Sequence, residues 1–348
     1  MAAIITYPSA IEYWLREKGI PYHFRFDPMS SGVNNKAVQR ATSSRADIIQ
    51  SVNELKFTEP VHVLAVESVQ RNATGSIVFH RMPKKLPANS FLKVSEGIYI
   101  CSPEYCFLQA AKYLSFPQLV LLANDLCAIY MKDDETEYQQ RRRDPITTVK
   151  KIQSFLNQSN NIQGVTRAKR AIRYALDRSN SPMESRLAVL ARLPFSRGGY
   201  ALPEPKLNLR LRLQKKAADY LGRDYCTCDI VWEEQKVILE YDSSLSHLNK
   251  EQHIQDKGRA TALTMSGYKV LSATSEQVKN FGNVEILFIN LRQELNMRTH
   301  QNRLDQYYEL RRKVVHQLLF ADRWNSPKGE TQNMYKFPEM WNNNNTDW

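Results

Sequence analysis

The chain has 348 residues, of which 42% are hydrophobic and 24% charged, and this length is too great for one ordinary hydrophobic core. We therefore expect two domains. No apolar run reaches the ~18 residues of a membrane span, and the first residues lack the charged and apolar regions of a secretory signal, so we expect a cytoplasmic protein without a membrane partner. The net charge of +12 favours a polyanionic partner, because each neutralised phosphate releases counterions.

The five cysteines do not form the paired C-x2-C spacing of a zinc site. An odd number of cysteines also argues against a disulfide framework. Cys226 and Cys228 alternate along an expected strand and share one face of it. We therefore expect them to be buried as small apolar residues.

The first half of the chain predicts helices and strands in a smaller, mainly helical α+β domain. Apolar spacing predicts helices at Ala10 to Lys18 and Ile48 to Leu55. Strand-like runs follow at Val61 to Val69, Ser76 to His80 and Phe91 to Cys101. Two helices come next, one opened by Ser102-Pro103-Glu104 and the other running from Pro117 to Tyr130.

A charged stretch without aliphatic residues, Lys132 to Pro145, predicts a domain boundary. We expect an N-terminal domain over 1–135, regulatory or partner-binding, and a basic helical linker over 136–178. The linker's two amphipathic helices, Thr147 to Leu156 and Thr166 to Leu176, carry the cations Lys150, Lys151, Arg167, Lys169, Arg170 and Arg173. These side chains form either a solvated helix face or a track for phosphates.

The second half predicts a domain over 179–325, in the order helix, irregular segment, strand, strand, helix, strand, helix. Its last helices are expected at Gly282 to Asn296 and Asn302 to Leu319. The final residues, 326–348, end in the low-complexity MWNNNNTDW and are expected to be disordered.

The segment CDIVW-EEQK-VILEYD predicts a hairpin with acids on its strands. If Glu233 to Lys236 form a four-residue loop, Trp232 pairs with Val237 and Asp229 falls opposite Glu240. The two carboxylates would then lie about 5 Å apart. Alternation places Asp242 on the same face.

Adjacent carboxylates repel, and a divalent cation such as Mg²⁺ or Mn²⁺ would remove the repulsion because it prefers oxygen ligands. Glu184, on the preceding helix, is the candidate for a third ligand beside Asp229 and Glu240. Two alternatives stay open. Ser181-Pro182-Met183-Glu184 also has the pattern of a helix capping box, and the hairpin acids could be paired with arginines or separated by a shifted register.

The stretch from Ser181 to Thr274 resembles the very-short-patch-repair-like endonucleases of the PD-(D/E)XK superfamily. The resemblance lies in SPMESRLAVLARLP, CDIVWEEQKVILEYDSSLSH and QDKGRATALTMSGYKVLSAT. The positions that correspond to the family's pattern are Glu184, Asp229, Glu240, Tyr241, Asp242, His247, Asp256, Arg259 and Gly267. The resemblance implies a restriction-endonuclease-like mixed sheet flanked by helices, and a metal-dependent endonuclease that cuts DNA.

Within that implied site, Glu184, Asp229 and Glu240 would hold one or two Mg²⁺ ions, and His247 or a lysine would assist proton transfer. Arg259 would neutralise phosphate or pair with Asp256. The remaining basic residues of the domain would grip the backbone of the nucleic acid: Arg210, Arg212, Lys215 and Lys216.

One position departs from the family pattern, because Asp242 stands where the superfamily has a lysine. Lys250, Lys257 or His247 could replace that lysine. The alternative function is therefore a weak or inactive nuclease fold that binds nucleic acid as a regulator or antitoxin. A further alternative is an interaction protein whose N-terminal half binds a protein partner.

A second resemblance covers about Lys93 to Met131, through ICSPEYCFLQAAKYLS and LVLLANDLCAIY. This segment looks like the one that accompanies such domains in AbiEi-like abortive-infection proteins. The resemblance implies a bacterial or phage-defence setting.

Overall fold

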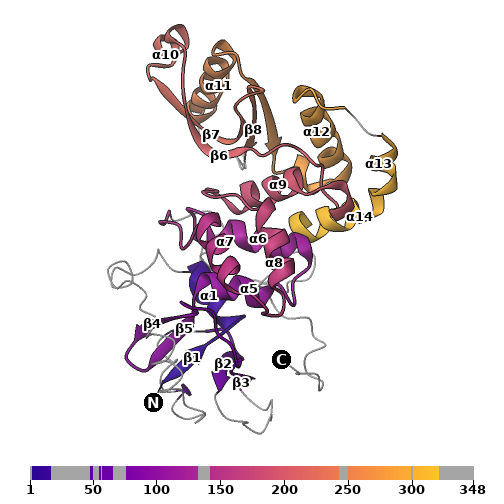
Figure 1. The fold of residues 1–348 in the computed structure, drawn as a ribbon. Coiled ribbons are helices and arrows are strands. Elements are labelled where there is room, and N and C mark those ends of the chain that lie inside the picture. Colours follow the sequence, from indigo (N-terminus) through magenta and orange to yellow (C-terminus); the bar gives the residue numbers. More distant parts are fainter. Residues whose placement is uncertain are drawn as a thin grey trace. The chain divides into compact units, whose positions relative to one another are not determined.

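The computed structural model describes residues 2–16, 48–49, 55, 57–65, 76–131, 142–242, 250–298 and 301–320, without the side chains of 250–256. The protein is mixed α+β with two mixed sheets (Figure 1). Its described residues form two compact units, and the division falls between Ala175 and Leu176. None of the described helices is both long enough and apolar enough to cross a membrane.

The first unit is built on a five-stranded sheet in the order β3-β2-β1-β5-β4. Its strands are β1 (Ala3–Ile5), β2 (Val61–Ala65), β3 (Ile77–Arg81), β4 (Phe91–Ser95) and β5 (Ile98–Cys101). The single strand expected from Phe91 to Cys101 is wrong: β4 and β5 pair antiparallel. The turn between them contains Gly97 at φ 76°, a conformation that glycine adopts without a steric penalty.

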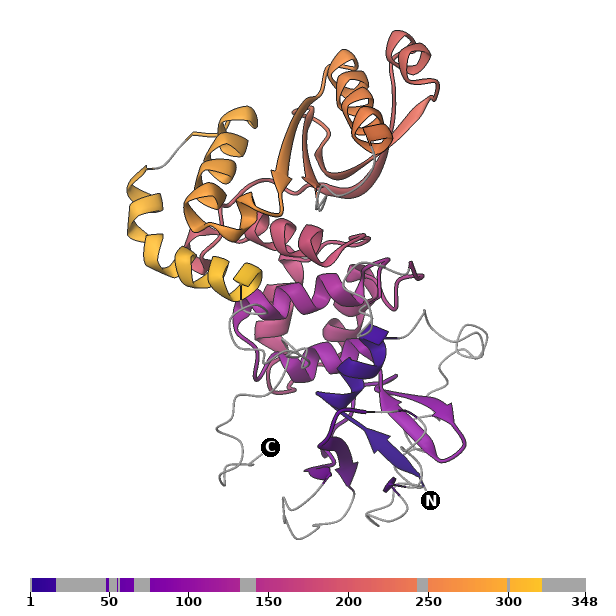
Figure 2. The same ribbon diagram turned by 180° about the vertical axis from the view of Figure 1, so that it is seen from behind.

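The helices of the first unit surround a buried apolar core (Figure 2). They are α1 (Ser9–Arg16), α5 (Pro103–Ala110), α6 (Phe116–Leu126), α7 (Val149–Gln158), α8 (Val165–Ala171) and the short 3-10 helix η2 (Ile172–Tyr174). The predicted start of α5 is confirmed, since Ser102 caps the helix and Pro103 begins it. The helix expected to reach Tyr130 ends at Leu126 instead.

The second unit contains a four-stranded sheet in the order β6-β7-β8-β9. Its strands are β6 (Lys206–Arg212), β7 (Tyr225–Trp232), β8 (Val237–Asp242) and β9 (Lys269–Thr274). The first two pairings are antiparallel and the last is parallel. The irregular segment expected before the hairpin is wrong, because the structure has the strand β6 there. The alternation of leucine with polar residues in KLNLRLR has the period of a half-buried strand.

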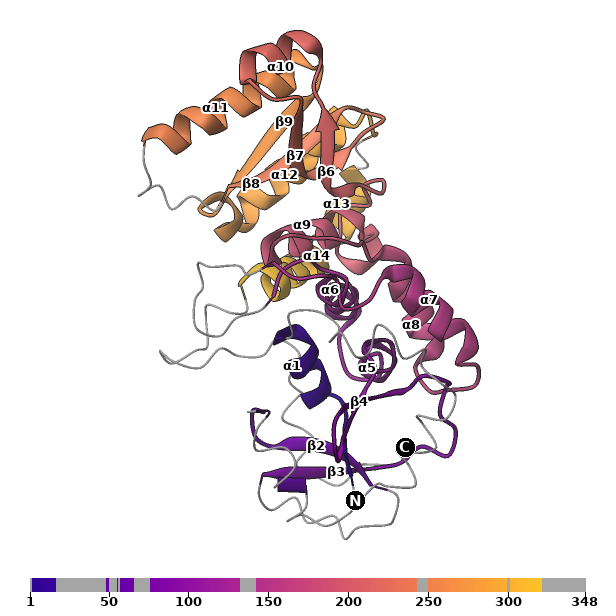
Figure 3. The ribbon, with the colours of Figure 1, turned by 90° about the vertical axis from the view of Figure 1, so that its left-hand side faces the viewer.

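Helices α10 (Lys215–Leu221) and α11 (Lys250–Met265) lie together on one side of this sheet (Figure 3). They cover an apolar cluster that includes Leu211, Ala217, Cys226, Cys228 and Leu263. The prediction that both cysteines are buried is confirmed. The short helix α10 was not expected from the sequence.

The other helical elements of the second unit are α9 (Pro182–Arg192), η3 (Phe195–Arg197), η4 (Gln277–Lys279), α12 (Phe281–Glu294), α13 (Gln301–Gln306), α14 (Tyr308–Val315) and η5 (His316–Phe320). The continuous helix expected from Asn302 to Leu319 is interrupted at Tyr307.

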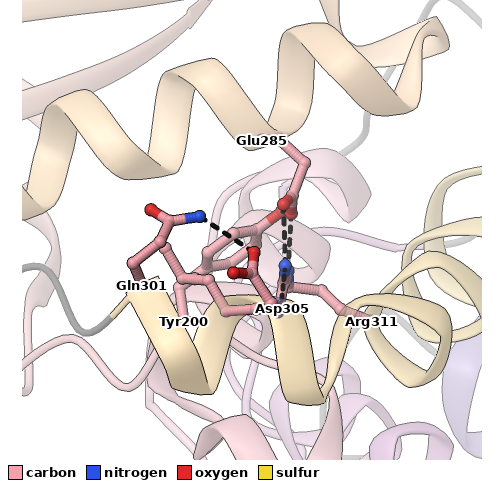
Figure 4. Close-up of polar contacts among 6 residues, drawn as sticks. Tyr200, Glu285, Gln301, Asp305 and Arg311 are labelled. Atoms are coloured by element: carbon pink, nitrogen blue, oxygen red, sulfur yellow. Dashed lines mark hydrogen bonds and ion pairs between the residues drawn. The ribbon is translucent and has the colours of Figure 1, made fainter.

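A buried polar cluster joins α14 to α12 (Figure 4). The Arg311 side chain is 1% exposed and donates from Nε to Glu285 Oε1 at 2.5 Å and from Nη2 to Glu285 Oε2 at 2.8 Å. The Tyr200 hydroxyl donates to the same carboxylate, and Arg311 Nη2 also reaches the carbonyl of Leu304. The charges of the cluster are balanced, one guanidinium against one carboxylate, although Nη1 of Arg311 is buried without a hydrogen-bond partner among the described residues.

Candidate functional site

The hairpin that carries two of the predicted acids has the expected register. Trp232 pairs with Val237 and Val231 with Ile238, across a four-residue turn. The next step of this register places Asp229 opposite Glu240. There Asp229 Oδ2 accepts the backbone N–H of Tyr241 at 2.9 Å, so a carboxylate takes the position that a backbone carbonyl would hold in a continuous ladder.

The third predicted acid, Glu184, lies in the first turn of α9 and is 4% exposed. Ser181 caps this helix by accepting the N–H of Glu184 at 3.1 Å, as the sequence predicts. The Glu184 carboxylate does not accept a hydrogen bond from the backbone N–H of Ser181. Its Oε2 accepts from the N–H of Asn180 at 2.9 Å and from Nδ2 of Asn208 at 2.7 Å, so the second half of the predicted capping box is wrong.

Asp229 acts electrostatically on both Glu184 and Glu240. Burial, and after it the charge of Asp229, raises the pKa of Glu184 to about 7. The same two causes raise the pKa of Glu240 to about 7, although Arg259 opposes the shift. Burial also raises the pKa of Asp229. Because both glutamates respond to Asp229, this residue is the electrostatic centre of the cluster.

Arg259 supplies positive charge to the cluster from α11. Its Nη2 lies 2.7 Å from Glu240 Oε1 and 2.6 Å from the carbonyl oxygen of Thr227. The expected alternative partner, Asp256, lies outside the described side chains. Among the described ion pairs of this unit, only this one reaches the three acids, so carboxylate charge exceeds guanidinium charge in the cluster.

Two residues that the sequence prediction missed, Asn180 and Asn208, hold the Glu184 carboxylate. Asn208 has φ 49° within β6, and asparagine is one of the few residues that adopts this region readily. Its Nδ2 also donates to the carbonyl of Arg178 at 3.1 Å. An asparagine inside an alternating leucine strand was the available signal, because asparagine is depleted in ordinary strands.

The other predicted site residues contribute less to the cluster. Asp242 is exposed at the end of β8, opposite Thr274 of β9. His247 lies outside the described residues, and so does the side chain of Lys250. Lys257 is exposed on α11.

The predicted cations of the first unit fall into two groups. Lys150, Lys151, Arg170 and Arg173 are exposed. Arg167 instead donates to the carbonyl oxygens of Ala111 at 2.6 Å and Leu114 at 2.5 Å. Lys169 is half-buried beside Asn160, with 3.5 Å between Nζ and Oδ1. The prediction that Arg167 contacts phosphate conflicts with these contacts, which give it a structural role near the end of α5.

Four of the predicted cations of the second unit are exposed, whereas Arg259 is half-buried and paired with Glu240. Arg210 and Arg212 lie on β6, and Lys215 and Lys216 lie on α10. The guanidinium carbon of Arg210 lies 4.3 Å from the centroid of the Tyr225 ring, on the neighbouring strand. This arrangement is a cation–π contact at the surface.

The chemistry of Glu184, Asp229 and Glu240 fits a hard divalent cation, because all three offer carboxylate oxygens. Burial is the main cause of their raised pKa values, and the charge of Asp229 adds to it at both glutamates. However, no group of three or more His, Cys, Asp or Glu side chains in the described part of the chain is arranged to hold a metal ion. The donor set is therefore present, and the side chains would have to move to close around an ion.

Comparisons of the chain with protein-family models, with curated proteins and with solved structures give no match.

Proposed function

We propose that this protein is a metal-dependent nuclease that hydrolyses phosphodiester bonds, with DNA as the expected substrate, and that Glu184, Asp229 and Glu240 form its site. One observation carries the proposal: three carboxylates from a helix and two strands gather around Asp229, whose charge, after burial, raises the pKa of both Glu184 and Glu240. Uncompensated buried carboxylates cost stability, and such clusters are concentrated at functional sites.

The order of elements supports the proposal. Glu184 lies on a helix, Asp229 on a strand and Glu240 on the next strand, and a helix with Arg259 and a final parallel strand after Gly267 follow. This is the order that the resemblance to PD-(D/E)XK endonucleases implies. The resemblance also suggests the bacterial or phage-defence setting.

In this proposal each residue of the site has a distinct role. Asp229, Glu240 and Glu184 would hold one or two Mg²⁺ or Mn²⁺ ions. When bound, such an ion lowers the pKa of water and stabilises charge on phosphate. The N–H of Tyr241 orients Asp229, and Asn180 and Asn208 orient Glu184. Arg259, released from Glu240, would neutralise a phosphate oxygen. His247 or Lys257 would assist proton transfer.

A second candidate function is binding of nucleic acid without cleavage, as a regulator or antitoxin. Two observations favour it: Arg259 already neutralises Glu240, and Asp242 stands where the superfamily has lysine. In that case the cluster would be a remnant of a catalytic site, and the basic surface would be the functional part.

Cleavage of plasmid and of single-stranded DNA and RNA, with Mg²⁺, with Mn²⁺ and with chelator, tests the proposal. The matched pair of variants is Glu240→Gln in the cluster and Glu234→Gln, which is exposed in the hairpin turn. We expect metal-dependent cleavage that Glu240→Gln removes and Glu234→Gln retains. Binding of nucleic acid without cleavage, in both Mg²⁺ and Mn²⁺, would support the second candidate function. Cleavage that survives Glu240→Gln would refute the proposed site.

A further inference from the structure

A strip of exposed basic and aromatic side chains lies along β6 and β7. Exposure alternates on both strands, so Arg210, Arg212, Tyr225 and Thr227 are exposed while Leu211, Cys226 and Cys228 are buried. The pairing places Arg210 opposite Thr227 and Arg212 opposite Tyr225. All four side chains therefore lie on one face, opposite the face that α10 and α11 cover.

Along the strands, the strip ends near the residues that hold the acids, whereas Glu240 lies on the other face, beside Cys228 and Arg259 of α11. Two residues before Arg210 on β6 is Asn208, which holds Glu184, and two residues after Thr227 on β7 is Asp229. At a rise of about 3.3 Å per residue, Arg210 and Arg212 lie roughly 7 and 13 Å along the strand from Asn208.

The charge of the region fits an extended polyanion. Arg210 and Arg212 are the cations of the strip, and residues 206–225 contain six lysines and arginines and two aspartates in all, of which Lys215 and Lys216 lie on α10. Within the described part of the chain, only Lys206 among these cations has an ion pair, with Glu233. The other five cations are exposed and have no carboxylate partner among the described ion pairs, so their positive charge remains available to an anionic ligand.

The aromatic side chains distinguish a single strand from a duplex. Tyr225 is 38% exposed, and the guanidinium carbon of Arg210 lies 4.3 Å from the centroid of its ring. Exposed aromatic rings and guanidinium planes within a basic groove stack unpaired bases, which a duplex keeps inside its own stack. We propose that the strip of Arg210, Arg212 and Tyr225 binds a single-stranded segment of nucleic acid. Binding by the strip does not rest on the proposed nuclease function.

Equilibrium binding tests this without cleavage, through the fluorescence anisotropy of labelled single-stranded DNA, single-stranded RNA and hairpin duplex in chelator. The stacking variant is Tyr225→Leu, matched by Tyr308→Leu, which is 43% exposed on α14. The charge variant is Arg210→Gln with Arg212→Gln, matched by Arg312→Gln with Lys313→Gln, also exposed on α14. Unfolding curves of all four variants ensure that the comparison is between folded proteins.

We expect Tyr225→Leu to weaken single-strand binding about 5- to 100-fold without changing its salt dependence, because stacking is not ionic. The double arginine variant should reduce the slope of log affinity against log salt by about 1.4, at ~0.7 per phosphate. The matched variants should bind like the unmodified protein. Equal binding by Tyr225→Leu, or tighter binding of duplex than of single strand, would overturn the proposal. Absence of cleavage with this binding pattern intact would refute only the nuclease proposal.

Discussion

Two buried polar clusters of the second unit contain similar residues in different proportions. In the first, Arg311 binds both oxygens of Glu285 and Tyr200 adds a third contact. In the second, Glu184, Asp229 and Glu240 share one guanidinium, that of Arg259. The first cluster has one guanidinium for one carboxylate, and the second holds excess negative charge.

The difference shows how a structural ion pair can be separated from a candidate site. A carboxylate whose charge is matched stabilises the packing of two helices, and it needs no ligand. A carboxylate that lies beside another carboxylate is held there at a cost in stability, which only a ligand or a proton removes. The raised pKa values of Glu184 and Glu240, both about 7, express that cost.

The largest expected effect on stability is in the balanced cluster. Replacing Arg311 by methionine leaves Glu285 buried without its cation, so we expect the free energy of unfolding to fall by about 3–5 kcal/mol. Arg312→Met, one residue along and exposed, should change it by less than about 0.5 kcal/mol. Urea unfolding measures both. A loss below about 1 kcal/mol for Arg311→Met would show that this cluster is not the structural anchor.

Asp229→Asn should affect function and not fold. The amide oxygen still accepts from Tyr241, but the charge that both glutamates experience is lost. We expect cleavage to fall about 100- to 1000-fold, on the scale of one lost electrostatic contact in a catalytic site, while the free energy of unfolding stays equal or rises. Asp224→Asn, exposed just before β7, is the control. A simultaneous loss of stability would make Asp229 structural.

The pH dependence of stability should distinguish the two clusters in the absence of divalent ions. The ordinary pKa of a glutamate is 4.5, and folding raises that of Glu184 and Glu240 to about 7. Between these values the folded protein binds more protons than the unfolded one, so stability falls as pH rises through this window. The fall is on the order of 1.4 kcal/mol per pH unit for each proton held.

The double variant Glu184→Gln with Glu240→Gln isolates this contribution. It should match the unmodified protein near pH 4.5 and become the more stable of the two toward pH 8, as thermal or urea unfolding at several pH values will show. A constant difference across that range would mean that the two carboxyls titrate normally.

The smallest effect is expected at the helix cap beneath Glu184. Ser181→Ala removes the acceptor for the N–H of Glu184, so we expect a loss of about 1 kcal/mol in unfolding free energy. Cleavage should change less than it does in Asp229→Asn, because Asn180 and Asn208 still hold the carboxylate. If Ser181→Ala lost cleavage activity while its unfolding free energy stayed unchanged, the cap would contribute to the position of Glu184 in the site.

The sequence by itself determined the local features of the site. The polar turn and the apolar strands fixed the pairing of Trp232 with Val237, since a slip of one residue would expose an entire apolar face. Ser181 and Pro182 fixed the start of α9, because capping depends on neighbours along the chain. The same register predicts that Asp229 lies opposite Glu240.

Only the tertiary structure decided what surrounds those acids. The partner of Arg259 is Glu240 on a strand, because the packing of α11 against the sheet brings them together. Asn208 reaches Glu184 from a strand that the sequence prediction missed, and Arg167 is bound by carbonyls 53 and 56 residues away. These contacts join segments distant in sequence, and no local periodicity or propensity encodes them, so they follow from how the elements pack.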